Sequence, residues 1–155
     1  MNKDGNDQES MRSLIRDYAC QVVLSQDVTA RYLGLTASDM KCWRVIDSYG
    51  PMTPSELVRR TGFTSGGITK IVDHLAEYGA VRRRFEQDDR RSLVIEALDP
   101  DKDALRDPLL DFDALVDEMT HRYSEAEAAV IRDFLKHGAN TLEVFSDQLQ
   151  AKEKY

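Results

Sequence analysis

Two groups of side chains near the middle of the chain have the chemistry to bind a nucleic acid. The first is a run of small polar residues with one lysine and one histidine: Thr64, Ser65, Gly66, Gly67, Thr69, Lys70 and His74. The second group consists of five arginines: Arg82, Arg83, Arg84, Arg90 and Arg91. Hydroxyl, amine and imidazole groups can hydrogen-bond to base edges, and guanidinium groups bind phosphates. Together the two groups predict a surface that binds double-stranded DNA.

The small polar residues must lie on a helix if they are to act together. The apolar residues among them recur at i, i+3, i+4 and i+7, namely Ile68, Ile71, Val72 and Leu75. Thr64 is a typical N-cap residue, and Gly79 is a typical C-terminal stop. At about 100° of rotation per residue, the polar residues point away from the apolar stripe. We therefore expect a helix between Thr64 and Gly79 whose exposed face contacts DNA.

Two adjacent glycines, Gly66 and Gly67, allow two interpretations of the start of this helix. Each costs roughly 1 kcal/mol relative to alanine in a helix interior. They belong either to a frayed first turn or to a place where the backbone approaches a phosphate or a base edge. The small, uncharged neighbours favour the second interpretation.

A shorter helix precedes this one, and a hairpin follows it. Thr53 and Glu56 form a capping box with Pro54 at the first helical position, and Gly62 ends that helix. Residues 81–85 and 93–98 have the composition of strands, with a polar connection at residues 86–89. A run of arginines is usually a solvated surface, but behind a helix-turn-helix it can reach phosphates or a minor groove. Residues 35–98 are therefore predicted to be a winged helix-turn-helix DNA-binding domain, in a fold that is mainly α with a small β-hairpin wing.

The rest of the chain is predicted to be helical. Residues 1–9 are expected to be disordered, and a long helix runs from Ser10 to about Leu33. Thr36 and Asp39 cap a helix that ends near Tyr49. After residue 100 we expect a helix over 101–123, irregular at Pro108, and a last helix from a capping box of Ser124 and Glu127 to about Leu149.

The last helix has an apolar seam with a spacing of four and three residues, in which Gly138 fills one step. Its members, with Phe134 beside them, are Ile131, Leu135, Leu142, Phe145 and Leu149. Such a seam is typical of coiled coils and needs a partner. The partner is either a second subunit or the first helix of the same subunit. We favour the dimer, so residues 10–34 and 101–150 are predicted to form a helical dimerisation region that includes Leu14 and Ile15.

Charge and cysteine content limit the possible functions. The net charge is −7 and the isoelectric point is near 5.0, although a DNA-binding protein is expected to be basic. The acidic residues are concentrated at the end: residues 53–98 hold eight basic and seven acidic residues, and residues 99–155 hold seven and fourteen. Two cysteines, the lack of an apolar run of about 18 residues and a polar N-terminus together predict a cytoplasmic protein.

No complete set of catalytic motifs is found in the sequence. Ser38 and Lys41 match a Ser-x-x-Lys pattern, but its partner motifs are absent. The sequence contains no glycine-rich phosphate-binding loop and no nucleophile-elbow pattern. His74, His121 and His137 are too scattered to show the spacing of metal ligands. We therefore expect no enzyme activity, no cofactor and no metal.

Four segments resemble the MarR family of transcription regulators. They are residues 36–43, 50–57, 73–83 and 89–94, and the specific match extends from about residue 33 to residue 98. The resemblance implies that the helix after the turn reads the major groove through Ser65, Gly66, Gly67, Thr69, Lys70 and His74. It implies that Asp89 stabilises the wing and that Arg91, with Arg90, contacts DNA. The sequence departs from the family pattern at residues 98–101, where many members have a threonine-led helix start.

The resemblance also implies a function. It predicts a homodimeric regulator, most often a repressor, that binds a palindromic operator and responds to a small-molecule effector in a pocket near Met40 and Trp43. Two alternatives stay open. The mild charge of residues 53–98 suits a winged-helix dimer that binds protein, and Cys20 could serve a thiol redox sensor, although we interpret Cys20 and Cys42 as small buried hydrophobic residues.

Overall fold

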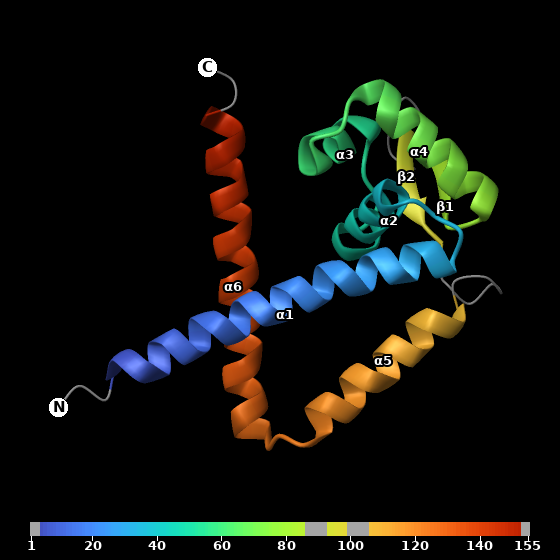
Figure 1. Cartoon of the computed structure of the whole chain (residues 1–155). Coiled ribbons are helices and arrows are strands. Elements are labelled where there is room, and N and C mark those ends of the chain that lie inside the picture. The colour runs from blue at the N-terminus through green and yellow to red at the C-terminus, as the bar shows by residue number, and fades with distance from the viewer. Residues whose placement is uncertain (1–3, 86–92, 99–105, 153–155) are drawn as a thin grey trace. The chain divides into compact units, whose positions relative to one another are not determined.

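The computed structural model describes residues 4–85, 93–98 and 106–152. In chain order the elements are α1 (Asp4–Tyr32), α2 (Ala37–Tyr49), α3 (Pro54–Thr61), α4 (Ser65–Tyr78), β1 (Val81–Phe85), β2 (Leu93–Ala97), α5 (Arg106–His121) and α6 (Glu125–Lys152) (Figure 1). The chain divides into two units, residues 1–109 and 110–155. The predicted fold class, mainly α with a small hairpin, is confirmed.

The first unit has its core where α2, α3, α4 and the hairpin meet (Figure 1). Five side chains at the centre of this core are at most 2% exposed: Trp43, Ile46, Leu57, Leu75 and Ile95. The C-terminal end of α1 adds Ala30 and Leu33. Burial of these apolar stripes is the main favourable contribution to the folding of this unit.

Local capping chemistry starts and ends the short helices as the sequence predicts. Thr36 and Asp39 form a complete capping box at α2, and Thr53 and Glu56 form another at α3. The hydrogen bonds from Thr53 lower the pKa of Glu56. At the other ends, Gly62 and Gly79 adopt the left-handed conformation, with φ of 75° and 84°. That conformation is strained for residues with a Cβ atom.

The strands β1 and β2 form an antiparallel hairpin, and a third segment of the chain pairs with β2 at one residue. Val81 lies opposite Ala97, and Phe85 lies opposite Leu93. Met52, just before α3, pairs with Ile95: the Met52 N–H donates to the Ile95 carbonyl at 3.0 Å, and the Ile95 N–H donates back at 2.8 Å. This third segment was not predicted. The predicted connection at residues 86–89 lies outside the described residues.

The first helix begins earlier than predicted. It starts at Asp4 rather than Ser10, so the predicted disorder of residues 1–9 is wrong for residues 4–9. None of the described helices combines the length and the apolar character that a membrane span requires.

The last two helices, α5 and α6, are present as the sequence predicts, but their first and last residues differ from the predicted ones. α5 is described from Arg106, and residues 101–105 of the predicted helix lie outside the described residues. Pro108 lies in the first turn of α5, where a backbone N–H has no partner within the helix, so it causes no break. The capping box of Ser124 and Glu127 is confirmed, and α6 continues to Lys152.

Candidate nucleic-acid interface

The N-terminal half of α4 presents a face of short polar side chains. Its exposed residues are Thr64, Ser65, Gly66, Thr69 and Lys70, and Gly67 is half-buried. On the opposite side, Ile68 and Val72 are 1% exposed because they pack in the core. Thr64 accepts a hydrogen bond from the Gly67 N–H at 3.2 Å, which confirms Thr64 as the N-cap. The predicted face therefore exists on the surface of this unit.

The two glycines of this face differ in their surroundings. A Cβ atom added at Gly67 would lie 3.1 Å from the Thr64 hydroxyl oxygen, so glycine at this position protects the cap. A Cβ atom added at Gly66 would meet nothing within 4 Å. No steric reason inside this unit therefore explains glycine at position 66.

The turn between α3 and α4 is fastened to α2. The Lys41 ammonium donates to the Thr61 carbonyl at 2.8 Å and lies 4.9 Å from the centre of the Phe63 ring. The Thr61 hydroxyl donates to the Leu57 carbonyl at 2.6 Å. These contacts satisfy carbonyl groups at the end of α3 and so fix where α4 begins.

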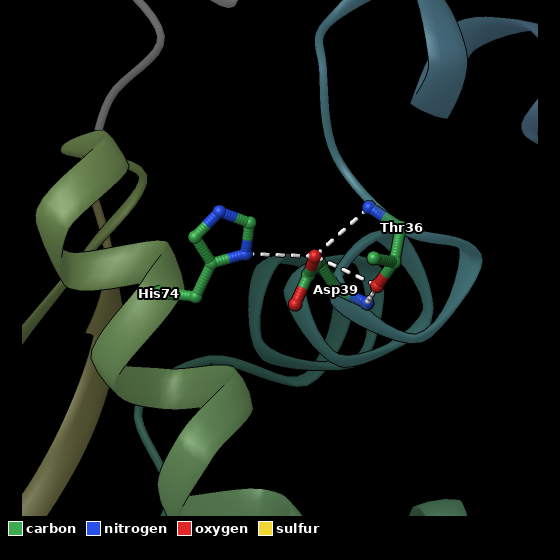
Figure 2. Close-up of polar contacts among 3 residues, drawn as sticks. All are labelled: Thr36, Asp39 and His74. Atoms are coloured by element: carbon green, nitrogen blue, oxygen red, sulfur yellow. Dashed lines mark hydrogen bonds and ion pairs between the residues drawn. The ribbon is translucent and has the colours of Figure 1, made fainter.

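The C-terminal half of α4 is committed to contacts inside the unit. Asp73 accepts a hydrogen bond from Arg83 at 2.6 Å, and His74 bonds to Asp39 at 2.9 Å (Figure 2). His74 is among the predicted DNA-contacting residues, and the structure places its ring against α2. Asp39 and His74 are 35 residues apart, so no local pattern in the sequence indicated their contact.

The arginines of β1 share their charge with acidic neighbours. Arg82 and Arg84 both donate to one carboxylate oxygen of Glu96 on β2, at 2.8 and 3.1 Å. The hydrogen bond from Arg82, with the charges of Arg82 and Arg84, holds the pKa of Glu96 below its usual value. Arg84, a predicted DNA contact, is half-buried, whereas Arg82 is exposed. The role of Glu96 as counter-charge was not predicted, although cross-strand alternation places it on the same face as these arginines.

Three predicted wing residues, Asp89, Arg90 and Arg91, lie outside the described residues. Their roles in stabilising the wing and contacting DNA stay predictions.

The residues of the predicted dimer interface are mostly exposed in the single chain. They are Leu14, Ile15, Phe134, Leu135, Leu142, Phe145 and Leu149, with Ile131 half-buried. Leu142 is 67% exposed, and no residue of α6 is buried. A helix of 28 residues with an apolar seam and no buried side chain leaves a large apolar surface in contact with water.

The two residues of the predicted effector pocket belong to the core. Met40 and Trp43 are each 2% exposed. The indole N–H of Trp43 is buried and has no hydrogen-bond partner in the part of the chain that the structure describes. Most buried donors are paired, so this N–H marks a place with an unused hydrogen-bonding capacity.

The two cysteines lie in different environments. Cys42 is buried, as predicted, and burial raises the pKa of its thiol to about 11. Cys20 is exposed on α1, so its interpretation as a buried hydrophobic residue is wrong for this chain. Across residues 4–85, 93–98 and 106–152, no three His, Cys, Asp or Glu side chains are grouped so that they could hold a metal ion.

The arrangement of these elements defines a class of protein. Two helices, α3 and α4, are joined by a tight turn at Gly62, and a two-stranded hairpin follows the second helix directly. This is a winged helix-turn-helix, in which the second helix is the recognition helix.

Comparisons with known proteins agree with this class. A family model described as the MarR family matches residues 33–92. The chain is 31% identical to the HTH-type transcriptional regulator YcgE of Bacillus subtilis over 88% of this chain and 89% of YcgE. It is 30% identical to the HTH-type transcriptional repressor YetL of the same organism, over 62% of this chain and 58% of YetL. The fold resembles that of Streptococcus pneumoniae FabT in complex with DNA, with a TM-score of 0.62 and 21% identity over 88% of this chain and 97% of FabT.

The chain belongs to the MarR family of winged helix-turn-helix transcription regulators.

Proposed function

We propose that this DNA-binding transcription regulator acts as a homodimer that binds a palindromic operator and represses transcription until an effector is bound. The observation that carries the proposal is the exposed N-terminal half of α4, where Thr64, Ser65, Gly66, Thr69 and Lys70 form one small polar face. A helix with short side chains at its N-terminal end can enter a major groove closely and hydrogen-bond to base edges.

Two relatives support this proposal. FabT, which shares the fold, has been crystallised with DNA, and YetL is named as a repressor. Within residues 35–98 we assign base reading to the N-terminal half of α4 and backbone or minor-groove contact to the wing, with Arg90 and Arg91 as its contacting residues and Asp89 as its stabilising residue.

The apolar surface of α6 supports the homodimer. Leu142, Phe145 and Leu149 are exposed along one seam of α6, and Leu14 and Ile15 are exposed on α1. A second copy would cover these residues, and a twofold dimer presents two recognition helices to a palindromic site. We therefore assign residues 10–34 and 101–150 to dimerisation.

The effector is the least defined part of the proposal. The unpaired indole N–H of Trp43, on α2 between the recognition helix and the end of α1, supports a ligand that brings a hydrogen-bond acceptor. An effector that binds one arrangement of the two recognition helices better than another would shift the equilibrium and change operator affinity.

A pull-down of genomic fragments followed by gel shift at two salt concentrations tests the DNA-binding part. We expect one strong palindromic site whose binding weakens as salt rises, because cations on the protein displace counterions from DNA. If no sequence-specific site is found at either salt concentration, the protein-binding alternative is favoured. The observation that supports the protein-binding alternative is the pairing of Arg82 and Arg84 with Glu96, which reduces the positive charge available to DNA.

The thiol redox alternative is tested with one variant. Cys20 is exposed on α1 and is accessible to an oxidant in the single chain. We expect an organic peroxide to have the same effect on operator binding by the wild type and by Cys20→Ser. A response of the wild type that the variant lacks would establish Cys20 as a redox sensor.

A further inference from the structure

A chain of hydrogen bonds connects the recognition helix to the start of α2. One carboxylate oxygen of Asp39 accepts from the Thr36 N–H at 2.8 Å and from the Thr36 hydroxyl at 2.7 Å. The same oxygen lies 2.9 Å from Nδ1 of His74, which comes from the last turns of α4 (Figure 2). The Asp39 side chain is 3% exposed, so protein groups take the place of water around it.

The direction of the His74 bond follows from its partner. A carboxylate oxygen accepts hydrogen bonds, so Nδ1 of His74 is the donor. A buried carboxylate loses much of its solvation and depends on each donor that remains. The His74 ring therefore cannot turn away from Asp39 without leaving that carboxylate short of a partner.

The apolar contacts between α2 and α4 restrict the orientation of α4 less than the hydrogen bond between His74 and Asp39 does. Trp43 and Ile46 of α2 share a core cluster with Ile68, Val72 and Leu75 of α4. Apolar burial is non-directional, so small rotations of a helix change its free energy little. A hydrogen bond has a preferred distance and angle, and so restricts the rotation of α4 about its own axis.

We propose that His74 is a positioning residue that sets the orientation of the recognition helix through Asp39. This inference rests on the proposed function, in which the N-terminal half of α4 reads the operator. His74 lies in the other half of that helix, and its Nδ1 is engaged by Asp39 at 2.9 Å, so we assign its ring the role of an anchor rather than of a base contact. The anchor point is the N-terminus of α2, directly after the segment that leaves α1.

Two substitutions separate anchoring from base reading. The amide nitrogen of asparagine lies as many bonds from the backbone as Nδ1 of histidine, whereas that of glutamine corresponds to Nε2. His74→Asn can thus keep the donor to Asp39, and His74→Gln displaces it. We expect gel shifts with the cognate operator to show His74→Gln and His74→Ala bound about tenfold more weakly than wild type, or about 1.4 kcal/mol. His74→Asn should stay within about threefold of wild type, which is about 0.7 kcal/mol.

A double-mutant cycle tests the partner. Asp39→Asn should weaken operator binding, and His74→Ala should weaken it less in the Asp39→Asn background than in wild type, because both changes act on the same Asp39–His74 interaction. The matched controls are His121→Gln, an exposed histidine that bonds to a carbonyl of its own helix, and Glu127→Gln, a capping-box carboxylate on α6. All variants are compared at a temperature where circular dichroism shows them fully folded, so that lost stability alone does not lower affinity.

Opposite results would overturn the inference. If His74→Gln binds as wild type and His74→Asn does not, Nε2 contacts the DNA. A change in base preference at one operator position in His74→Ala leads to the same conclusion. If His74→Ala binds the operator as tightly as wild type does, the hydrogen bond between His74 and Asp39 does not orient α4. These outcomes differ from failure of the proposed function, in which the wild type itself has no operator and the inference falls with it.

Discussion

Gly66 and Gly67 stand side by side in the first turn of α4, and the structure gives a local reason for only one of them. At Gly67 a side chain would press against the capping hydroxyl of Thr64. At Gly66 the space is open and the residue is exposed. Glycine at an exposed helical position costs stability, and we propose that DNA approaches the backbone closely at position 66.

Replacing Gly66 with alanine tests this explanation. Gly66→Ala should stabilise the protein by about 0.5–1 kcal/mol, because alanine loses less backbone freedom on folding. The same change should weaken operator binding, because a methyl group then stands between the backbone and the DNA. Urea unfolding and gel shift measure the two effects.

Gly67→Ala is the comparison, and it should stabilise the protein less than Gly66→Ala does, because its methyl group would lie 3.1 Å from the Thr64 hydroxyl oxygen. A stabilised Gly66→Ala that binds the operator as wild type would reduce Gly66 to an ordinary first-turn residue.

The two thiols should react at very different rates. Cys42 is buried with its pKa raised to about 11, so at pH 8 roughly 0.1% of it is thiolate, the reactive form. Cys20 is exposed. We expect a thiol reagent to label one cysteine of the native protein quickly and the second only after denaturation. Cys20→Ser should lose the fast phase, and fast labelling that persists in this variant would contradict the burial of Cys42.

Residue roles that depend on neighbours three positions away could be predicted, and those that depend on distant residues could not. Thr36 and Asp39 were predicted as a capping box because the pattern lies within one turn of helix. The third partner of Asp39, His74, comes from another helix and leaves no trace in local spacing. Cys20 was expected to be buried because a sequence does not show which side of an isolated helix is covered.

At the scale of elements, the hairpin combines positive charge with its own counter-charge. Glu96 accepts hydrogen bonds from Arg82 and Arg84 on the neighbouring strand. In Glu96→Gln both guanidinium groups keep their charge and lose the carboxylate. We expect tighter binding to non-operator DNA with a steeper dependence on salt, because more cations are free to bind phosphates.

Glu118→Gln, which removes one exposed carboxylate from α5, is the control for net charge. If the two variants bind non-operator DNA equally, the pairing of Glu96 with Arg82 and Arg84 does not reduce their binding to phosphates.

The lowered pKa of Glu96 also predicts how stability depends on pH. A carboxyl whose pKa is lower in the folded than in the unfolded protein stabilises the fold above its unfolded value, and this contribution is lost as pH falls through the folded value. Wild type should therefore be more stable than Glu96→Gln at pH 7, and the difference should shrink below about pH 4.5. Urea midpoints of both proteins at several pH values measure this difference. A difference that stays constant down to pH 3 would show that another property of the side chain is responsible.

Helices and strands could be predicted where their chemistry is local. Capping boxes and glycine stops placed α2, α3 and α4, and strand composition placed β1 and β2. The start of α1 was missed because its first residues are polar and carry no amphipathic pattern. The bridge between Met52 and Ile95 was missed because one residue pair has no periodicity.

For the whole molecule, the exposed seam of α6 makes assembly the central prediction. Leu142→Glu with Phe145→Glu places two charges on that seam, and a buried unpaired charge is costly. We expect the double variant to be monomeric by sedimentation and to bind the operator weakly, because each half-site is then bound alone.

Asn140→Glu is the matched control, since residue 140 lies between the seam positions and points to the other side of the helix. It should remain dimeric. A dimeric double variant would show that the seam is not the interface.

The pairing of Met52 with Ile95 closes a loop of chain that contains all of α3, α4 and β1. Both residues are buried, and each donates its N–H to the other. Neither amide can exchange with solvent deuterium until this loop opens, so the wing and the helix-turn-helix should open as one cooperative unit. Met52 and Ile95 should share one slow exchange rate, and the recognition helix would then move together with its wing whenever the protein takes up or releases DNA.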